Sequence, residues 1–500
     1  MKKYILVIDQ GTTSSRAIIF NNFGEIEWIE KEEFTQIYPK PGWVEHDPEE
    51  IFQSVLRVIK KAIEGLNIKP KDISSIGITN QRETTILFDK ESGKPVYNAI
   101  VWQCRRSSDI CEEIKKKGLT EKIHKKTGLI VDAYFSLTKI LWLLKNNDEI
   151  LKKAEKGEIG FGTVDTYLLY RLTNKKSFFT DYSNASRTML FNIKTLKYDD
   201  ELIDIFKIPR SILPEVKPTS SLFGILDKEI LGTEIPITAM VGDQQSSLFG
   251  ELCLDKGMVK NTYGTGSFIL LNTQEKIVYS SSGLLTTIAW GINDKINYAL
   301  EGSIFISGAA VQWLRDGLGI IKNSCEVEDL AKKVSSSEGV YFVPAFVGLG
   351  TPYWDMYARG LIVGITRKTS KEHIARATLE AISFQIKEVL DIMENETKEK
   401  IVVLRVDGGG AMNDTLLQIQ SDFLGIKVER PKILETTAFG ACLLSGLYTG
   451  VFKYENLNEI FSVDRSFEPK MKREDFENLF KGWKEAIRRS LNWEKSSTMS

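Results

Sequence analysis

Short apolar runs separated by polar turns open the chain. Residues 4–9 (YILVID) are mostly apolar, QGTTSS follows as a polar turn with one glycine, and RAIIF (16–20) is apolar again. A second turn, NNFG, leads into EIEWI (25–29). The succession of strand, tight turn, strand, turn and strand predicts a β-meander at the N-terminus.

A helical period follows this region. In residues 49–63 (EEIFQSVLRVIKKAI) the apolar side chains recur at helical spacing, and Asp47 and Pro48 supply a cap and a first-turn proline. ISSIGIT (73–79) is strand-like and ends at a loop that holds Gln81, Arg82 and Glu83. Because strands alternate with helices, the pattern predicts an α/β fold with ligands at strand ends.

A similar opening occurs past the midpoint. GMVKNT (257–262), YGTGS (263–267) and FILLN (268–272) repeat the order of strand, Gly/Thr turn and strand. Later, IVVLRVDGGG (401–410) precedes a helix that we expect to begin near Asn413. The two comparable halves predict a duplicated architecture.

We place the join near residue 250, which gives domains of residues 1–250 and 251–500. The boundary is soft because no linker rich in proline or serine marks it. Two domains also suit the length, since 500 residues exceed what one hydrophobic core usually organises. The polar residues after about Trp493 are expected to fray.

Composition and charge narrow the function. The chain is 42% hydrophobic and 27% charged, an ordinary globular balance. Its 66 Lys and Arg residues nearly cancel 67 Asp and Glu residues, so no basic excess exists to bind nucleic acid or an anionic membrane. Any bound anion must therefore be held by a few placed groups.

Targeting signals and cysteine pairs are not evident. The apolar run at residues 4–8 is too short for a signal peptide, and no uninterrupted apolar stretch is long enough for a membrane span. The five cysteines are scattered and form no CxxC pair, so neither a disulfide framework nor a zinc site is indicated. We expect a soluble, cytoplasmic protein without stable membrane insertion.

Four turns rich in glycine or threonine each follow a strand, at residues 9–14, 242–245, 263–267 and 407–410. Such turns let backbone N–H groups and hydroxyls approach phosphate oxygens. None matches GxxxxGK[ST] or GxGxxG, so neither a P-loop nor a Rossmann site is supported. One such turn alone is more often a structural hairpin, but several together indicate a phosphate site.

Two aspartates stand at strand ends. Asp9 is a candidate Mg²⁺ anchor through water, and its alternative is a turn-capping residue. Asp243 could accept a proton from a substrate hydroxyl, and its alternative is a helix N-cap. None of the three histidines, His46, His124 and His373, lies in a glycine-rich turn, so histidine cannot easily take this role.

Arg82 and Glu83 place hydrogen-bond donors beside an acceptor, an arrangement suited to adjacent hydroxyls of a polyol. The alternative is a surface ion pair, which is the commoner fate of such dipeptides. Trp102, Tyr134 and Phe268 could cover the carbon face of a small polyol, although each alone is more often a core residue.

The motifs together resemble the FGGY family of carbohydrate kinases, within the actin/Hsp70/hexokinase fold group. The resemblance implies two duplicated ribonuclease H-like domains with an active-site cleft between them. Residues 37–48, 80–85 and 102–106 are similar to the glycerol kinases in this family, rather than to xylulose, gluconate or ribulose kinases. The matching segments are DQGTTSSR (9–16), IGITNQRETT (76–85), NAIVWQCRR (98–106), YFSLTKILWL (134–143), GTVDT (162–166), GDQQSSLFG (242–250), NTYGTGSF (261–268) and GLIVGITRKTSKEHIARATLE (360–380).

The resemblance implies transfer of phosphate from ATP to glycerol, giving ADP and sn-glycerol 3-phosphate, with Mg²⁺ and with Asp243 as the general base. Relatives of this kind form homodimers and homotetramers. By the same resemblance, the metal is associated with Asp9 and Asp243, glycerol contacts Arg82, Glu83, Trp102, Tyr134, Asp243, Gln244 and Phe268, and the nucleotide contacts Thr12, Thr13, Ser14, Arg16, Thr265, Gly308, Gln312, Gly410 and Asp414.

Three positions depart from the family pattern. Asp414 stands where relatives often have asparagine, so the contact near the adenine is expected to change. Glu234, within LDKEILGTEIP (226–236), takes the place of an arginine found in enzymes inhibited by fructose 1,6-bisphosphate, so this regulation is predicted to be absent or weak. No histidine occurs between His124 and His373, so activation by histidine phosphorylation is also predicted to be absent.

Other functions remain as alternatives. Another sugar or polyol kinase of the same family would share most of the motifs. A non-catalytic, actin-like nucleotide switch would need no polyol pocket, so Arg82, Glu83 and Asp243 argue against it. A scaffold bound to a membrane or to nucleic acid is disfavoured by the near-zero net charge.

Overall fold

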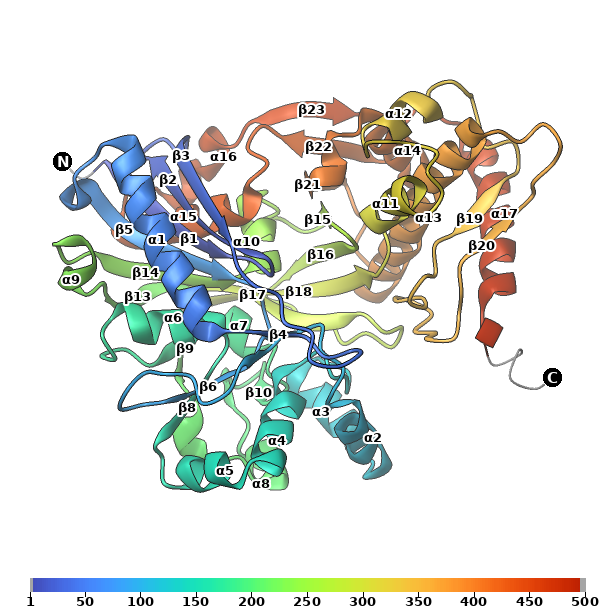
Figure 1. Ribbon diagram of the computed structural model, residues 1–500. Helices are drawn as coiled ribbons and strands as arrows, with labels where there is room; N and C mark the ends of the chain where they lie inside the picture. Colours follow the sequence, from blue (N-terminus) through green and yellow to red (C-terminus); the bar gives the residue numbers. More distant parts are fainter. Residues whose placement is uncertain (1–2, 495–500) are drawn as a thin grey trace.

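The computed structural model describes residues 3–494, so the end expected to fray lies almost wholly outside the described residues. Thirteen strands are connected in the order β23-β22-β21-β15-β16-β18-β17-β13-β14-β5-β1-β2-β3 (Figure 1). The two parts of this sheet meet at β13 (Ser220–Ile225) and β17 (Leu285–Ile292), which are joined by one residue pair, Ser220 with Ile292. Each half of the chain thus keeps a sheet of its own.

The first sheet begins with the predicted meander, β1 (Tyr4–Gln10), β2 (Ser14–Asn21) and β3 (Ile26–Glu33), which pair antiparallel in sequence. Then β5 (Ile73–Asn80) pairs parallel with β1, and β14 (Pro236–Gly242) pairs parallel with β5. The order across this sheet is therefore β3-β2-β1-β5-β14, with the carboxyl ends of the three parallel strands at one edge.

The second sheet repeats this order with β15 (Met258–Tyr263), β16 (Ser267–Gln274), β18 (Lys295–Ile304), β21 (Val403–Gly408) and β22 (Lys427–Pro431). The first three pair antiparallel, while β21 is parallel to β15 and β22 is parallel to β21. The predicted α/β fold with two duplicated, ribonuclease H-like halves is confirmed. The boundary at residue 250 stays a prediction.

Two helices lie between the sheets, α10 (Asp243–Gly250) and α15 (Thr436–Thr449). Their apolar side chains form one buried cluster with residues from β1, β2 and β14 of the first sheet and β16–β18 of the second. Glycines allow the two helices to approach closely: a Cβ on Gly250 would lie 2.1 Å from a backbone oxygen of α15, and one on Gly440 would lie 1.9 Å from a backbone oxygen of α10. This crossing joins the two halves through the helix that begins at Asp243.

The outer faces of the sheets are covered by amphipathic helices. α1 (Pro48–Leu66) starts as predicted, because the Asp47 side chain accepts a hydrogen bond from the Glu49 N–H. Together with α6 (Val164–Leu172) it packs on the first sheet. The outer face of the second sheet is covered by α11 (Gly308–Asp316), α12 (Glu326–Ala331), α13 (Lys371–Thr397), α14 (Asp414–Leu424) and α17 (Arg473–Ser490).

A smaller lobe with its own apolar core is inserted into the first half and occupies the lower part of Figure 1. Its helices are α2 (Ser108–Lys116), α3 (Thr120–Thr127), α4 (Ser136–Asn146), α5 (Asp148–Glu155) and α8 (Asp200–Phe206). The remaining short elements are β4 (Glu45–His46), β6 (Ile86–Asp89), β7 (Ala99–Ile100), β8 (Ile159–Gly162), β9 (Phe179–Asp181), α7 (Tyr182–Ala185), β10 (Phe191–Asn192), β11 (Lys197–Tyr198), β12 (Glu215–Lys217), α9 (Lys228–Leu231), β19 (Tyr341–Val343), β20 (Leu361–Val363), α16 (Leu457–Ile460) and β23 (Val463–Phe467). Within residues 3–494, every helix is too short or too polar to span a bilayer.

Candidate active site

The candidate site is built where the parallel strands of the first sheet end. In the sheet register Gln10 lies beside Asn80, and Asn80 lies beside Gly242. The three segments that follow these residues are the turn after β1, the loop after β5 and the first turn of α10. Because the carboxyl ends of parallel strands meet at one edge, residues far apart in the sequence are brought together.

Arg82 is the most highly connected side chain of this group. Its Nε lies 3.2 Å from Oδ1 of Asp243, and its Nη1 donates to Gln245 Oε1 at 3.1 Å. Its two terminal nitrogens also form a bidentate pair with Glu301, at 2.6 and 3.0 Å, and Nη2 lies 3.5 Å from the Tyr134 hydroxyl. Arg82 is only 3% exposed, so its interpretation as a surface ion pair is wrong.

Glu83 is held in an uncommon backbone conformation. Its φ is +59°, in the left-handed region that residues other than glycine rarely adopt. Ser136 and Thr85 hydroxyls donate to its carbonyl oxygen, both at 3.1 Å, and Arg187 Nε donates to its Oε1 at 2.6 Å. Burial raises the pKa of Glu83, and the nearby Arg187 and Arg82 oppose that shift. A buried acid in such a conformation is characteristic of a functional site.

The three predicted aromatic residues do come together. Trp102 meets Tyr134 edge-on with ring centroids 5.5 Å apart, and meets Phe268 edge-on at 6.3 Å. Its indole N–H donates to the Thr12 hydroxyl at 3.1 Å, which connects this wall to the turn after β1. Phe268 lies on β16, so the second half completes a wall that the first half begins.

Asp243 is the first residue of α10, and Gly242 occupies the N-cap position. The N-cap interpretation of Asp243 is therefore wrong. The Oδ1 atom of Asp243 accepts a hydrogen bond from the backbone N–H of Gln244 at 2.7 Å, and the Asp243 side chain remains 30% exposed. Burial raises the pKa of Asp243, while the positive charge of Arg82 acts in the opposite direction. A partly accessible carboxylate of raised basicity is suited to accept a proton.

Gln244 points toward the second half. Its Oε1 accepts a hydrogen bond from Lys260 Nζ at 2.5 Å, and the same ammonium donates to the Thr262 hydroxyl at 2.7 Å. Burial lowers the pKa of Lys260. The predicted contact of Gln244 with glycerol stays a prediction.

The turn after β1 is fixed by hydrogen bonds to its own backbone and to Gln36. Gly11 N–H donates to the Ser14 carbonyl at 2.9 Å, and the Gln36 amide donates to the Thr12 carbonyl at 3.1 Å. Thr13 at its tip is exposed, whereas Thr12 is half-buried. The turn follows β1 at the same sheet edge as the loop that holds Arg82, and the predicted phosphate contacts of Thr12, Thr13 and Ser14 stay predictions.

Asp9 and Arg16 form an ion pair at the base of this turn, and Arg16 also pairs with Glu435 from the loop before α15. Asp9 is buried, and burial raises its pKa against the opposing charge of Arg16. The pair with Glu435 crosses from one half of the chain to the other. Arg16 is thus held at the place where we expect phosphate groups to be bound.

The corresponding turn of the second half contains Thr265, and Gly308 and Gly410 pack against it. Ala309 N–H donates to the Thr265 carbonyl and Gly308 N–H to the Gly264 carbonyl, both at 3.0 Å. A Cβ on Gly308 would lie 2.5 Å from the Gly264 oxygen, and one on Gly410 would lie 2.7 Å from Tyr263 Cβ. Both positions require glycine. Gln312 is exposed one helical turn after Gly308 on α11.

Asp414 stands in the first turn of α14, after the N-cap Asn413. Its Oδ1 accepts from Arg430 Nη1 at 2.9 Å and its Oδ2 pairs with Arg465. The two arginines fix this carboxylate between α14 and the strands β22 and β23. Its predicted role near the adenine stays a prediction.

Comparisons with known proteins agree over nearly the whole chain. Residues 4–250 match the N-terminal domain of the FGGY family of carbohydrate kinases, and residues 259–448 match the C-terminal domain of that family. The chain belongs to the FGGY family of carbohydrate kinases. The resemblance inferred from the motifs is confirmed.

Relatives with high identity to this FGGY chain are named glycerol kinases. Glycerol kinase 2 of Thermotoga maritima is 60% identical, with 99% of this chain and 100% of the relative covered. Glycerol kinase of Caldanaerobacter subterraneus subsp. tengcongensis is 56% identical, with 99% of both covered. Among solved structures, the Plasmodium falciparum glycerol kinase with ADP is 40% identical, with a TM-score of 0.93 and 98% of both chains covered.

Several members of the site in this FGGY kinase were not found from the sequence. Glu301 lies in the strand YALEGS, where an acid among apolar residues is the one available signal. The other four were not assigned a role from the sequence, and the contacts of Arg187, Gln245 and Glu435 reach residues more than 100 positions away. They are Arg187, Gln245, Lys260 and Glu435.

The carboxylates of Asp9 and Asp243 fit a magnesium ion that keeps part of its water shell. Oxygen donors of this kind are the ligands Mg²⁺ prefers, and one or two carboxylates with substrate phosphates commonly hold it. Among residues 3–494, no group of three or more His, Cys, Asp or Glu side chains is arranged as a full coordination shell. The predicted association of a metal with Asp9 and Asp243 stays a prediction.

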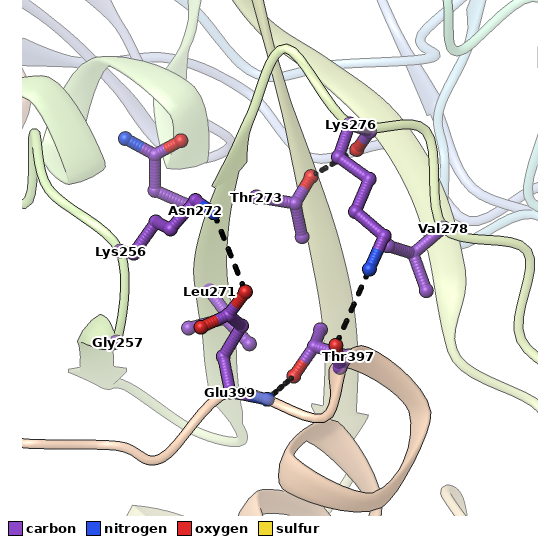
Figure 2. A pocket seen from close by; sticks show the side chains of 9 residues that line it. All are labelled: Lys256, Gly257, Leu271, Asn272, Thr273, Lys276, Val278, Thr397 and Glu399. Atoms are coloured by element: carbon purple, nitrogen blue, oxygen red, sulfur yellow. Dashed lines mark hydrogen bonds and ion pairs between the residues drawn. The ribbon is translucent and has the colours of Figure 1, made fainter.

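A small pocket lies apart from these residues, between the β15–β16 region and the end of α13 (Figure 2). Its polar groups are paired among themselves: Lys256 with Glu399 at 3.4 Å, Lys276 with the Thr397 carbonyl at 3.4 Å, and Thr273 with the Lys276 carbonyl at 2.7 Å. Because these groups satisfy one another, the pocket offers no set of convergent polar groups to a ligand.

Proposed function

We propose that this protein phosphorylates glycerol with ATP and releases ADP and sn-glycerol 3-phosphate. The observation that carries the proposal is the convergence of Arg82, Glu83, Tyr134 and Asp243 beside the half-buried ring of Trp102. A small polyol needs directional hydrogen bonds on one side and an apolar wall on the other. The identity to proteins named glycerol kinases supports the same substrate.

In this proposal, Arg82 and Glu83 orient neighbouring hydroxyl groups of glycerol, while Trp102 and Phe268 pack against its carbons. Arg82 donates and Glu83 accepts, so the pair distinguishes hydroxyl groups by direction as well as by position. Orientation by several fixed groups converts a weakly binding alcohol into a positioned nucleophile. Gln244 is a further candidate contact beside Asp243.

Asp243 is proposed as the general base. Its carboxylate takes the proton of the attacking hydroxyl while the oxygen forms a bond to the γ-phosphorus of ATP and the bond to ADP breaks, in line. Its partial exposure leaves room for the hydroxyl, and its pair with Arg82 fixes its direction.

The turns of both halves are proposed to hold the nucleotide. Thr12, Thr13 and Ser14 donate to phosphate oxygens, and Arg16 adds positive charge there. On the other side, ADP lies against Thr265, Gly308, Gln312, Gly410 and Asp414. When bound near Asp9 and Asp243, Mg²⁺ supplies charge neutralisation for the phosphates.

Substrate profiling tests the proposal against other kinases of the family. ADP release is measured by a coupled assay with glycerol, dihydroxyacetone, D-xylulose and gluconate at equal concentrations. We expect glycerol to give the highest kcat/KM. A higher value for a pentulose or gluconate would contradict the proposal, and so would turnover of ATP that no added alcohol increases.

The rate should depend on pH through Asp243. Burial raises its pKa above the ordinary value of 3.8, and only the ionised carboxylate accepts a proton. Activity is therefore present above the pKa and is lost as the pH falls through it. We expect the acid limb of kcat/KM for glycerol to have its midpoint above pH 3.8. If kcat/KM did not fall between neutral pH and pH 3.8 while the protein remained folded, the assignment of Asp243 as the general base would be contradicted.

Fructose 1,6-bisphosphate is expected to have little effect. Glu234 is exposed before β14, and its negative charge repels an anionic effector. The measurement is a titration of activity with the bisphosphate at fixed ATP and glycerol, with sodium sulfate at matched ionic strength as the control. Full inhibition at micromolar bisphosphate would show the expectation to be wrong.

A further inference from the structure

Two fully buried residues, Arg187 and Glu301, lie directly behind the groups to which we assign glycerol binding. Both side chains are 0% exposed. Arg187 follows the short helix α7 in the first half, and Glu301 lies on β18 in the second. Neither can reach solvent or a substrate without rearrangement, so their contacts are entirely with other protein groups.

These contacts form a continuous series of ion pairs from Arg82 to Glu83. Glu301 accepts hydrogen bonds from both terminal nitrogens of Arg82, at 2.6 and 3.0 Å. Its Oε1 also accepts a hydrogen bond from Arg187 Nη2 at 3.0 Å. Arg187 Nε in turn donates to Glu83 Oε1 at 2.6 Å. One end of the series fixes Arg82 and the other fixes Glu83. Bidentate arginine–carboxylate pairs of this kind define direction as well as distance.

We propose that Glu301 and Arg187 are positioning residues that set Arg82 and Glu83 for glycerol binding; the inference rests on the function proposed above. Glu301 holds the guanidinium of Arg82 from behind, and Arg187 holds one carboxylate oxygen of Glu83. The two groups that contact the polyol are then oriented before the substrate arrives, which lowers the cost of binding.

The second half of the chain takes part in this arrangement. In the sheet register Glu301 pairs with Leu270, two residues along β16 from Phe268. Neighbouring strands of the second half thus supply both one aromatic wall of the site and the anchor of Arg82. The second half, which carries the ADP-side turns, is connected through Glu301 to the polyol groups of the first.

Glu301 is ionised when it makes these contacts. Burial opposes its ionisation, but the nearby positive charges of Arg187 and Arg82 prevail and lower its pKa to about 2.

The test compares Glu301→Gln, Glu301→Asp and the unaltered enzyme in glycerol KM, ATP KM and kcat. For Glu301→Gln we expect glycerol KM to rise about 10- to 100-fold, as when a buried charged hydrogen bond is lost, with ATP KM little changed. Glu301→Asp keeps the charge but not the bidentate geometry, so glycerol KM should rise in this variant too.

Glu380→Gln is the matched control, because Glu380 is also buried and paired with an arginine, Arg376, but lies on α13. It should not change glycerol KM. An unchanged glycerol KM in Glu301→Gln would overturn the inference, and so would a loss of kcat alone in both Glu301 variants. If Glu301→Gln does not fold, the glycerol KM of Glu301→Asp is used in its place. A raised value supports the inference, and an unchanged value overturns it. Absence of glycerol-dependent turnover in the unaltered enzyme would instead contradict the proposed function.

Discussion

Asp243→Asn is expected to lower kcat for glycerol phosphorylation by about 10²- to 10⁴-fold, the usual contribution of a general base. The amide keeps the size of the side chain but cannot take the proton of the attacking hydroxyl. Because Asp243 is partly exposed and is not the cap of α10, the substitution should leave the fold intact. The measurement is steady-state kinetics with both substrates, together with circular dichroism and a thermal melt.

Asp294→Asn is the control for this substitution, since Asp294 is exposed in the turn between β17 and β18. It should keep the kinetic constants of the unaltered enzyme. Turnover of Asp243→Asn close to that of the unaltered enzyme would remove the base assignment. Loss of turnover together with loss of the melting transition would mean that Asp243 acts on the fold instead.

Arg82→Met should affect both stability and activity. It removes the partner of Glu301 and Asp243, and the loss of one member of a buried ion pair typically costs about 3–5 kcal/mol. Glu301 retains Arg187, which limits the loss. We expect a lower melting temperature, and kcat/KM for glycerol reduced about 10²- to 10³-fold by the loss of charged hydrogen bonds.

A matched arginine separates the two effects. Arg57 pairs with Glu32 at 2.5 Å, but about half of its side chain is exposed, and surface pairs contribute little. Arg57→Met should therefore leave both the melting temperature and the kinetic constants nearly unchanged. If Arg82→Met left both the melting temperature and kcat/KM unchanged, the importance of the Arg82 ion pairs with Glu301 and Asp243 would be contradicted.

Local patterns were sufficient to predict much of the fold. The meander of β1, β2 and β3 and the cap of α1 at Asp47 depend on neighbouring residues, so sequence periodicity and turn composition predicted them. The duplication followed from the repeated order of strand, Gly/Thr turn and strand at residues 257–272. The equal strand order in both sheets confirms it.

The contacts that hold the site could not be predicted in the same way. Arg82 and Glu301 are 219 positions apart, and no period or spacing connects them. Arg187 donates side-chain hydrogen bonds to two distant regions of the chain, at Glu83 and at Glu301. Asp9 and Asp243 were found because each ends an apolar strand, whereas the partners of Arg16 and Asp414 depend on how distant strands and helices pack.

The proposed activity is tested by a coupled ADP-release assay of the purified protein with Mg²⁺ and ATP, with and without glycerol, followed by identification of the product. We expect ADP release to increase strongly on addition of glycerol, with one sn-glycerol 3-phosphate formed for each ADP. Equal ADP release in both samples, with no phosphorylated glycerol formed, would contradict the proposed activity.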